Sequence, residues 1–246
     1  MRRFGLIGKT LKHSFSQSYF TRKFSESNLT ACRYDNFELS TINELPALLD
    51  NTKDLQGFNV TIPYKLEVIP FLHEKMKMVE EIGACNCVRI TESKLIGYNT
   101  DAIAFQSSLK KRLKPHHHCA LVLGSGGASK AVQYALKELG IDFIVVSRNK
   151  KFNQLGYQDL GEDAIRNHQI IINTTPLGMY PNVQDDPPIP YTSLTSKHLL
   201  YDLVYNPEKT KFLQQGEQRG AEIVNGLEML HAQAEESWRI WNSESL

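Results

Sequence analysis

The stretch Ala120-Leu-Val-Leu-Gly-Ser-Gly-Gly-Ala-Ser129 decides the fold of this chain. Its four apolar residues, 120–123, predict a buried parallel strand, and the glycines after them predict a sharp turn into an amphipathic helix. Gly140 ends that helix, and residues 143–146 predict the second strand of a βαβ unit. Backbone without side chains can approach a pyrophosphate closely. The turn therefore predicts a phosphate-binding site made by Gly124, Ser125, Gly126, Gly127 and Ala128.

The third position of the motif G-x-G-x-x-G/A falls on Ser129, which makes the motif weak when taken alone. The order of strand, turn, helix and strand supports it. An NAD site usually carries an acid after the second strand, but this chain has a basic turn there. Arg148 can bind a 2′-phosphate through its guanidinium, so the pattern favours NADP, although a solvated basic turn is the alternative. The predicted cofactor residues in this turn are Ser147, Arg148, Asn149, Lys150 and Lys151.

A second polar turn follows the apolar run 169–173. Because ligands collect at the carboxyl ends of strands in open α/β sheets, this turn is a second place where a cofactor could rest. The predicted cofactor residues here are Thr174, Thr175, Pro176 and Met179.

Composition excludes several classes of partner. The chain has 246 residues, a net charge of +1 and no long basic or acidic run, so a small-molecule ligand is expected rather than nucleic acid or a membrane surface. The apolar run after Arg2-Arg3 is too short for a signal peptide. The four cysteines form no C-x-x-C pair and suggest reduced thiols in a cytoplasmic protein. Residues 116–118 are three histidines without an accompanying ligand set, so we expect a solvated turn and no metal site.

The chain before the glycine turn is long enough to form a domain of its own. Residues 4–7 predict a strand, and the polar loop 12–16, which includes His13, leads to a helix with Ser16 as its expected N-cap. Ser14 and Ser16 are two residues apart and could point their hydroxyls into one cavity. Ordinary loop chemistry is the alternative.

Residues 57–62 alternate apolar and polar side chains as a strand does, which predicts Asn59 and Thr61 on one face. Pro63 suits the first turn of a following helix. Lys65 lies just past the carboxyl end of the strand, where ligands bind, although a lone lysine is more commonly a surface charge.

Two further polar residues stand near predicted helices. Asp101 is either the N-cap of a helix over 102–113 or a buried partner for a positive charge. Gln233 interrupts the apolar stripe of a final helix over 226–241. That stripe consists of Leu227, Leu230, Ala234, Trp238 and Trp241.

Taken together, these motifs resemble the shikimate dehydrogenase family over nearly the whole chain. The motifs occur in the family's order: Ser14-x-Ser16, Asn59-Val-Thr-x-Pro-x-Lys65, Gly83-Ala-x-Asn86, Asn99-Thr-Asp101, Gly124-x-Gly-Gly-Ala-Ser129, Asn173-x-Thr-x-x-Gly178-Met179, Asp202-x-x-Tyr205 and Gly226-x-x-Met229-x-x-x-Gln233.

The resemblance implies an α/β chain of two domains. An N-terminal open α/β domain, residues 1–101 with 226–246, would bind substrate, and a Rossmann-like domain with a parallel sheet, residues 102–225, would bind NADP. The implied reaction is the reversible NADPH-dependent reduction of 3-dehydroshikimate to shikimate in aromatic amino-acid biosynthesis, by a monomer or homodimer.

The resemblance also implies the site residues. Lys65 and Asp101 would be catalytic, and Leu203, Gly226 and Met229 would join the cofactor site. The residues expected around the substrate are Ser14, Ser16, Asn59, Thr61, Lys65, Asn86, Asp101, Tyr205 and Gln233.

The sequence departs from the family in three places. The segment between Lys151 and Ile170 is short, so a helix and a strand on the adenine side are expected to be reduced or missing. Phe152 stands near the place of a second arginine, and Cys87 stands where threonine is common. A dehydrogenase acting on quinate, or a non-catalytic NADP-binding sensor with the same fold, are the alternatives.

Overall fold

The computed structural model describes residues 1–12 and 14–243. Its internal contacts divide the chain into unit 1, Met1–Thr100 with Ala234–Leu246, and unit 2, Asp101–Gln233. The predicted domain boundaries, 1–101 with 226–246 and 102–225, instead place the whole of the last helix in the N-terminal domain, and they stay a prediction. His13, which the predicted N-terminal loop includes, lies outside the described residues.

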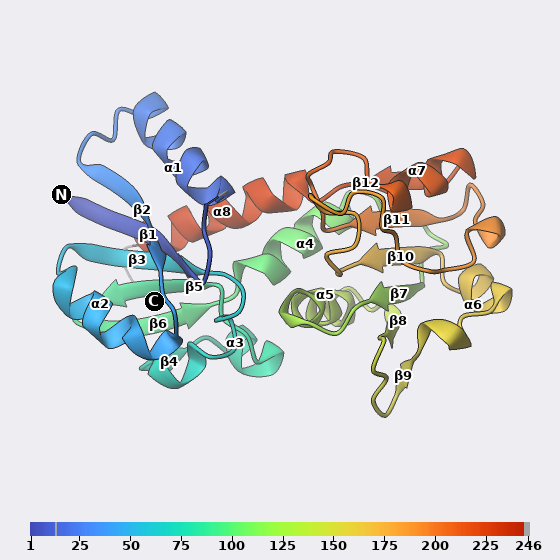
Figure 1. Ribbon diagram of the computed structural model, residues 1–246, viewed down its shortest axis with the longest axis horizontal. Coiled ribbons are helices and arrows are strands. Elements are labelled where there is room, and N and C mark those ends of the chain that lie inside the picture. The colour runs from blue at the N-terminus through green and yellow to red at the C-terminus, as the bar shows by residue number, and fades with distance from the viewer. Residues whose placement is uncertain (13, 244–246) are drawn as a thin grey trace. The chain divides into compact units, whose positions relative to one another are not determined.

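Unit 1 is built on a mixed sheet with strand order β2-β1-β3-β5-β6-β4 (Figure 1). The first three strands are parallel, and β5 and β6 continue the sheet as an antiparallel hairpin. The strands are β1 Arg2–Gly8, β2 Cys32–Glu38, β3 Leu55–Val60, β4 Glu74–Lys75, β5 Cys87–Thr91 and β6 Lys94–Tyr98. The helices are α1 Phe15–Glu26, α2 Leu45–Asn51 and α3 Lys77–Ile82, with 3-10 turns η1 Ile42–Glu44 and η2 Ile69–Phe71.

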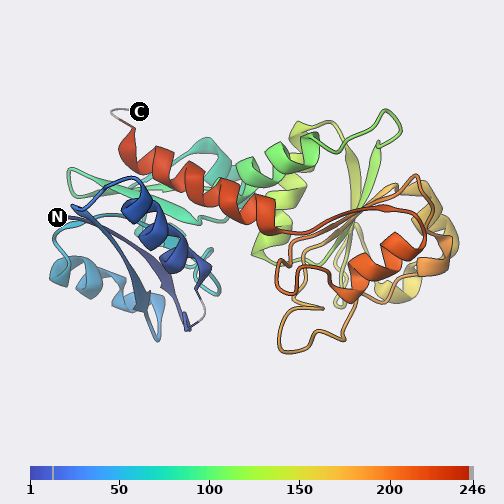
Figure 2. The ribbon, with the colours of Figure 1, turned by 90° about the horizontal axis from the view of Figure 1, so that it is seen from above.

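Alternation along the strands gives the unit 1 sheet two apolar faces. One face packs on α2 and α3 through residues such as Phe58 and Val60, and the other packs on α1 and on the last helix, α8 Leu227–Asn242. Figure 2 shows α1 beside the part of α8 that belongs to unit 1. Trp241 of α8 stacks on Phe4 with 4.8 Å between ring centroids, and its indole nitrogen donates to the Val88 carbonyl at 3.0 Å.

Gly57 explains how α8 comes so close to this sheet. A Cβ atom at Gly57 would lie 2.4 Å from the Trp241 ring, so the position has to remain glycine for the indole to reach the strand. Trp241 therefore fixes the last turns of α8 on the N-terminal sheet by apolar contact and a buried hydrogen bond.

Unit 2 contains an all-parallel sheet with strand order β12-β11-β10-β7-β8-β9 (Figure 1). Helices cover both faces, α4 and α5 on one side and α6 and α7 on the other. The strands are β7 Cys119–Leu123, β8 Asp142–Val146, β9 Gln154–Leu155, β10 Ile170–Asn173, β11 Leu199–Asp202 and β12 Glu222–Val224. The helices are α4 Thr100–Lys110, α5 Gly127–Glu138, α6 Glu162–Asn167 and α7 Lys211–Gln218, with 3-10 turns η3 Tyr157–Asp159 and η4 Tyr191–Ser193.

This topology confirms the predicted α/β class with a Rossmann-like parallel sheet. The chain leaves β7 towards β8 and β9, then crosses back to build β10, β11 and β12 on the opposite side. The carboxyl ends of β7 and β10 therefore flank the point where strand order reverses, and such points bind ligands in open α/β sheets.

Several local predictions were wrong where capping decides a helix start. Ser14, and not Ser16, is the N-cap of α1, because its hydroxyl accepts from the Gln17 amide at 3.4 Å. Thr210 is the N-cap of α7, where its hydroxyl accepts from the Leu213 amide at 3.4 Å. Helix α4 begins at Thr100, so Asp101 lies in its first turn and is not its cap.

The helix predicted after Pro63 is wrong, whereas the predicted last helix is confirmed as α8, although its apolar stripe includes an exposed leucine. Residues 62–68 form successive turns and not a helix after Pro63, with the Tyr64 hydroxyl held by the Leu39 carbonyl at 2.7 Å. Leu227 of the predicted α8 stripe is 40% exposed, whereas the polar Ser237 is fully buried.

The segment after Lys151 does contain the reduced elements expected there, namely the two-residue strand β9 and the six-residue helix α6. Over the residues it describes, the structure contains no helix long and apolar enough to cross a membrane.

Candidate active site

The glycine turn after β7 contains two glycines with different requirements. Gly124 has φ +109°, donates to the Val146 carbonyl at 2.8 Å and would place a Cβ 2.7 Å from the Thr174 hydroxyl oxygen, so the fold itself needs glycine there. Gly126 has φ −79°, and among the described residues no atom lies within 4 Å of a Cβ built on it. The fold itself therefore does not need glycine at 126.

Gly126 is also the N-cap of α5, so the first amides of that helix point out of the same turn. Such amides favour a phosphate. Together with the open space at Gly126, they form a cradle that fits the pyrophosphate of a dinucleotide. The other predicted residues of this turn, Ser125, Gly127 and Ala128, lie in it or in the first turn of α5.

The structure explains why serine stands at position 129, where the glycine motif usually has glycine or alanine. Its side chain is fully buried and donates to the Gly124 carbonyl at 2.7 Å, while Gln133 donates to it at 2.9 Å. The hydroxyl thus ties helix α5 to the turn at the place where a glycine or alanine would only allow close approach.

The basic turn after β8 is exposed except at its first residue. Ser147 is buried and its hydroxyl lies 3.1 Å from that of Ser125, whereas Arg148, Asn149 and Lys151 are exposed. Burial raises the pKa of Tyr157, and the positive charge of Arg148 opposes that rise.

Lys150 has a partner that was not anticipated from the sequence. Its ammonium lies 2.8 Å from Asp159, which also accepts from the Gly156 amide at 2.8 Å, and these hydrogen bonds lower the Asp159 pKa. The positive charge of Lys150 is therefore partly neutralised by the carboxylate of Asp159 in η3. The only signal in the sequence is Gly156-x-x-Asp159, the spacing of a capping residue.

The turn after β10 is fixed by hydrogen bonds of its own side chains. Thr174 donates to the Leu123 carbonyl at 2.7 Å, and Thr175 donates to the Asn173 amide oxygen at 2.6 Å. Pro176 and Met179 are exposed beside them. This turn therefore lies next to the end of β7, as the predicted cofactor site requires.

Asp202, the last residue of β11, is buried and hydrogen-bonds Asn173, from which the turn after β10 begins. Burial raises its pKa to about 6, although hydrogen bonds from Thr210, the Val204 amide and Asn173 oppose the rise. The Asn173 amide donates to it at 2.9 Å.

The remaining predicted residues of unit 2 that follow β11 are buried or half-buried. Gly226 is required by the fold, because a Cβ there would lie 2.1 Å from the carbonyl oxygen of the half-buried Leu203. Met229 belongs to the hydrophobic core. Tyr205 is half-buried, which raises the pKa of its phenol, and Gln233 is 9% exposed and donates to the Leu230 carbonyl at 3.0 Å.

Asn59 is a structural junction within unit 1. Its amide oxygen accepts from the Tyr34 hydroxyl at 3.0 Å, and its amide nitrogen donates to the Asn86 carbonyl at 3.2 Å and to the Ser237 hydroxyl at 2.8 Å. Burial raises the pKa of the Tyr34 phenol, and the hydroxyl of Ser16, on α1, opposes that rise. The structure therefore brings Ser16 and Asn59 together through a tyrosine that was not among the predicted site residues.

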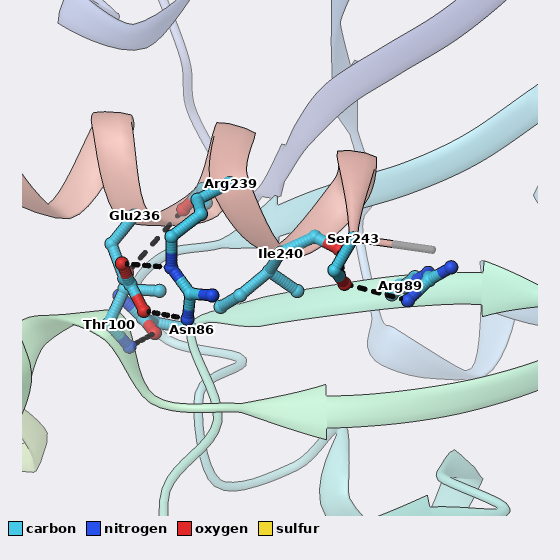
Figure 3. Close-up of polar contacts among 8 residues, drawn as sticks. Asn86, Arg89, Thr100, Glu236, Arg239, Ile240 and Ser243 are labelled. Carbon is cyan, nitrogen blue, oxygen red and sulfur yellow. Dashed lines mark hydrogen bonds and ion pairs between the residues drawn. The ribbon is translucent and has the colours of Figure 1, made fainter. Parts of the chain in front are cut away.

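Asn86 holds the start of α4. Its amide oxygen accepts from the Thr100 amide at 2.7 Å, and its amide nitrogen donates to the Thr100 hydroxyl at 2.9 Å (Figure 3). These bonds fix the residue that immediately precedes Asp101, a carboxylate that is 9% exposed.

Thr61 and Lys65 follow β3 in the run of turns. The Thr61 amide donates to the Ile7 carbonyl at 2.9 Å, and the carbonyl of Lys65 accepts from the Cys85 amide at 2.7 Å. The Lys65 side chain is half-buried. Lys65 belongs to unit 1 and Asp101 to unit 2, so their predicted partnership stays a prediction.

Cys87 and the histidines at 116–118 have no place in the predicted site, and the structure shows their surroundings. Cys87 is fully buried, which raises the pKa of its thiol, and the Ser237 hydroxyl opposes that rise. The turn predicted to be solvated at 116–118 is exposed at His116, but the prediction is wrong at His117, which is buried. Both rings approach the Lys197 carbonyl, at 3.1 Å and 3.3 Å. Over residues 1–12 and 14–243, no group of three or more His, Cys, Asp or Glu side chains is arranged to hold a metal ion.

Known proteins match this chain along nearly its whole length. Residues 6–88 match the family model described as the shikimate dehydrogenase substrate binding domain. The shikimate dehydrogenase (NADP(+)) of Caldicellulosiruptor bescii is 36% identical over 98% of this chain and 89% of that one.

Solved structures agree in fold. Shikimate dehydrogenase from Aquifex aeolicus matches with a TM-score of 0.87 and 34% identity, covering 100% of this chain and 94% of that one. Shikimate 5-dehydrogenase from Thermus thermophilus, in complex with NADP(H) and shikimate, matches with a TM-score of 0.87 and 29% identity, covering 98% and 94%. The chain therefore belongs to the shikimate dehydrogenase family.

Proposed function

We propose that this protein catalyses the reversible NADPH-dependent reduction of 3-dehydroshikimate to shikimate, a step of aromatic amino-acid biosynthesis. The observation that carries the proposal is the 36% identity over 98% of the chain to an NADP-dependent shikimate dehydrogenase. That similarity extends through both units, so it includes the glycine turn of unit 2 and the strand ends of unit 1.

The residues of unit 2 fit an NADP cofactor. The cradle at Gly124–Ala128 would hold the pyrophosphate, and the turn after β10 would support the cofactor from the neighbouring strand. Arg148 would bind the 2′-phosphate, because its guanidinium is exposed and no acid follows β8 to repel a second negative charge. When bound, NADPH supplies the hydride that reduces the carbonyl carbon of the substrate.

Lys65 is the proposed proton donor. Hydride delivery to a ketone leaves negative charge on the oxygen, and an ammonium stabilises that charge and then donates a proton to it. Asp101 would hydrogen-bond the substrate and favour the protonated form of Lys65. In the oxidation direction Lys65 has to accept the alcohol proton, so shikimate oxidation should rise towards alkaline pH.

The other proposed substrate residues bind or position. Ser14, Ser16, Thr61, Tyr205 and Gln233 offer hydroxyl and amide groups suited to the carboxylate and hydroxyls of shikimate. Asn59 and Asn86 would also bind substrate, and their hydrogen bonds within unit 1 hold them in place. We further propose a cytoplasmic enzyme, in keeping with four free cysteines, that works as a monomer or homodimer.

The test is to mix the purified protein with NADPH and 3-dehydroshikimate and to follow the absorbance of the reduced cofactor. The proposal predicts consumption of NADPH with shikimate as product, and a higher kcat/KM for shikimate than for quinate and for NADP than for NAD in the reverse direction. Preference for quinate would identify the related dehydrogenase. Binding of NADPH without turnover of either substrate would identify a sensor.

A further inference from the structure

A buried polar network crosses the core of unit 1 and ends at two of the proposed substrate residues. It joins α1, β2, β3, the start of α4 and α8. We call it the Ser237 network, after the member that comes from the far end of the chain. Its buried members are Tyr34 at 4% exposure, Asn59 at 4%, Asn86 at 3%, Thr100 at 0% and Ser237 at 0%.

Ser237 lies at the centre of this network. It accepts from the Asn59 amide nitrogen at 2.8 Å, and its hydroxyl oxygen lies 3.5 Å from that of Thr100. Asn59 leads from there to Tyr34, and Thr100 leads to Asn86, whose carbonyl also accepts from Asn59. The contacts therefore close a ring through Asn59, Asn86, Thr100 and Ser237.

Burial gives this ring its stiffness. A buried donor or acceptor without a partner is costly, so a closed set of satisfied groups has one favoured arrangement. Any member that is removed leaves at least one other group without its partner. The backbone is held as well, because the Thr100 amide and the Asn86 carbonyl both take part.

The two ends of the network are residues proposed to bind substrate. At one end, the Ser16 hydroxyl acts on the Tyr34 phenol and opposes the rise that burial causes in its pKa. At the other end, Thr100 is the first residue of α4 and is covalently followed by Asp101. Figure 3 shows Asn86 and Thr100 beside the unit 1 part of α8, from which Ser237 comes.

We propose that Ser237 is a positioning residue of the substrate site. The Ser237 hydroxyl fixes Asn59 and Thr100, and through them Ser16 and Asp101, in the geometry that binds shikimate. The proposal rests on the proposed function. Ser237 belongs to none of the sequence motifs, so its role comes from the contacts alone.

The test compares two network variants with a matched control. Ser237→Ala removes the central hydroxyl, and Tyr34→Phe removes the link to Ser16 while keeping the ring that stacks on Phe20 at 4.6 Å. Ser108→Ala is the control, because Ser108 is also buried, at 1% exposure, and accepts one buried hydrogen bond, from Tyr201, outside the network.

We expect kcat/KM for shikimate to fall by about tenfold or more in both network variants, while KM for NADP stays within about twofold. Ser108→Ala should keep both parameters near those of the parent and lose only thermal stability. If Ser237→Ala does not fold, Tyr34→Phe still decides the question.

Two results would overturn the proposal, and they can be told apart. Network variants that lose stability as Ser108→Ala does, but keep kcat/KM for shikimate, would make the network purely structural. A parent protein that turns over neither shikimate nor 3-dehydroshikimate would overturn the proposed function as well.

Discussion

Replacing Gly126 by alanine should separate cofactor binding from folding more cleanly than any other change in the glycine turn. The backbone at Gly126, φ −79° and ψ −172°, is open to any residue, and a Cβ there meets no atom of the described chain within 4 Å. Alanine loses some N-cap preference and lowers the entropy of the unfolded chain, and these effects nearly cancel within about 1 kcal/mol. The melting temperature should change by less than about 4 °C.

The effect on NADPH should be much larger. A methyl group in the cradle keeps the pyrophosphate away from the first amides of α5, and loss of hydrogen bonds to a charged group costs about 1.5 to 3 kcal/mol. The Kd for NADPH should therefore rise about tenfold to 150-fold.

Gly161 provides the matched control. It is the N-cap of α6, with φ −85° and ψ 176°, and a Cβ on it also meets no atom of the described residues within 4 Å. Fluorescence titration with NADPH and thermal melting of Gly126→Ala and Gly161→Ala give the comparison. Equal NADPH affinity in the two variants would refute the assignment of Gly126 to the cofactor cradle.

Three further predictions follow from single side chains. Arg148→Ala should raise KM for NADP at least about tenfold and leave KM for NAD nearly unchanged, whereas equal loss for both cofactors would show a structural role. Gln233→Ala should weaken shikimate binding in a calorimetric titration while the melting temperature stays near that of the parent; lost stability with unchanged affinity would assign Gln233 to the core. Asp202→Asn tests how the raised pKa of the buried Asp202 carboxyl affects stability. The Asp202 pKa is raised from 3.8 to about 6 in the folded protein, so the stability due to its neutral form is complete below the unfolded pKa and is lost as pH rises towards 6. Relative to the parent, the free energy of unfolding of Asp202→Asn should therefore increase by about 3 kcal/mol between about pH 4 and pH 7, and a difference independent of pH would contradict the shift.

The parts of the fold that local sequence determines could be predicted. The strand at 120–123, the sharp glycine turn after it and the parallel sheet follow from apolar runs and glycine spacing. The short β9 and α6 follow from the length of the segment after Lys151.

What could not be predicted depends on contacts between distant residues. Ser14 and Ser16 are both good caps, and the choice between them is made when α1 packs on the sheet. The partner of Asn59 is Ser237, 178 positions away, and a buried serine in a helix gives no signal in a hydrophobic pattern.

The candidate site was predicted by resemblance more than by pattern. Lysine and aspartate at 65 and 101 are unremarkable in composition, and only the ordered motifs single them out. The pairing of Lys150 with Asp159 is a salt bridge formed across a loop, and no periodicity indicates it.

The turnover of Lys65→Ala is the most direct test of the proposed chemistry. If Lys65 donates the proton to the reduced carbonyl oxygen, its loss should lower kcat for shikimate oxidation by about a hundredfold to ten-thousandfold. The Kd for NADP should stay near that of the parent, since the proposed cofactor residues lie in unit 2. A variant that keeps turnover within about tenfold of the parent would contradict the catalytic role of Lys65.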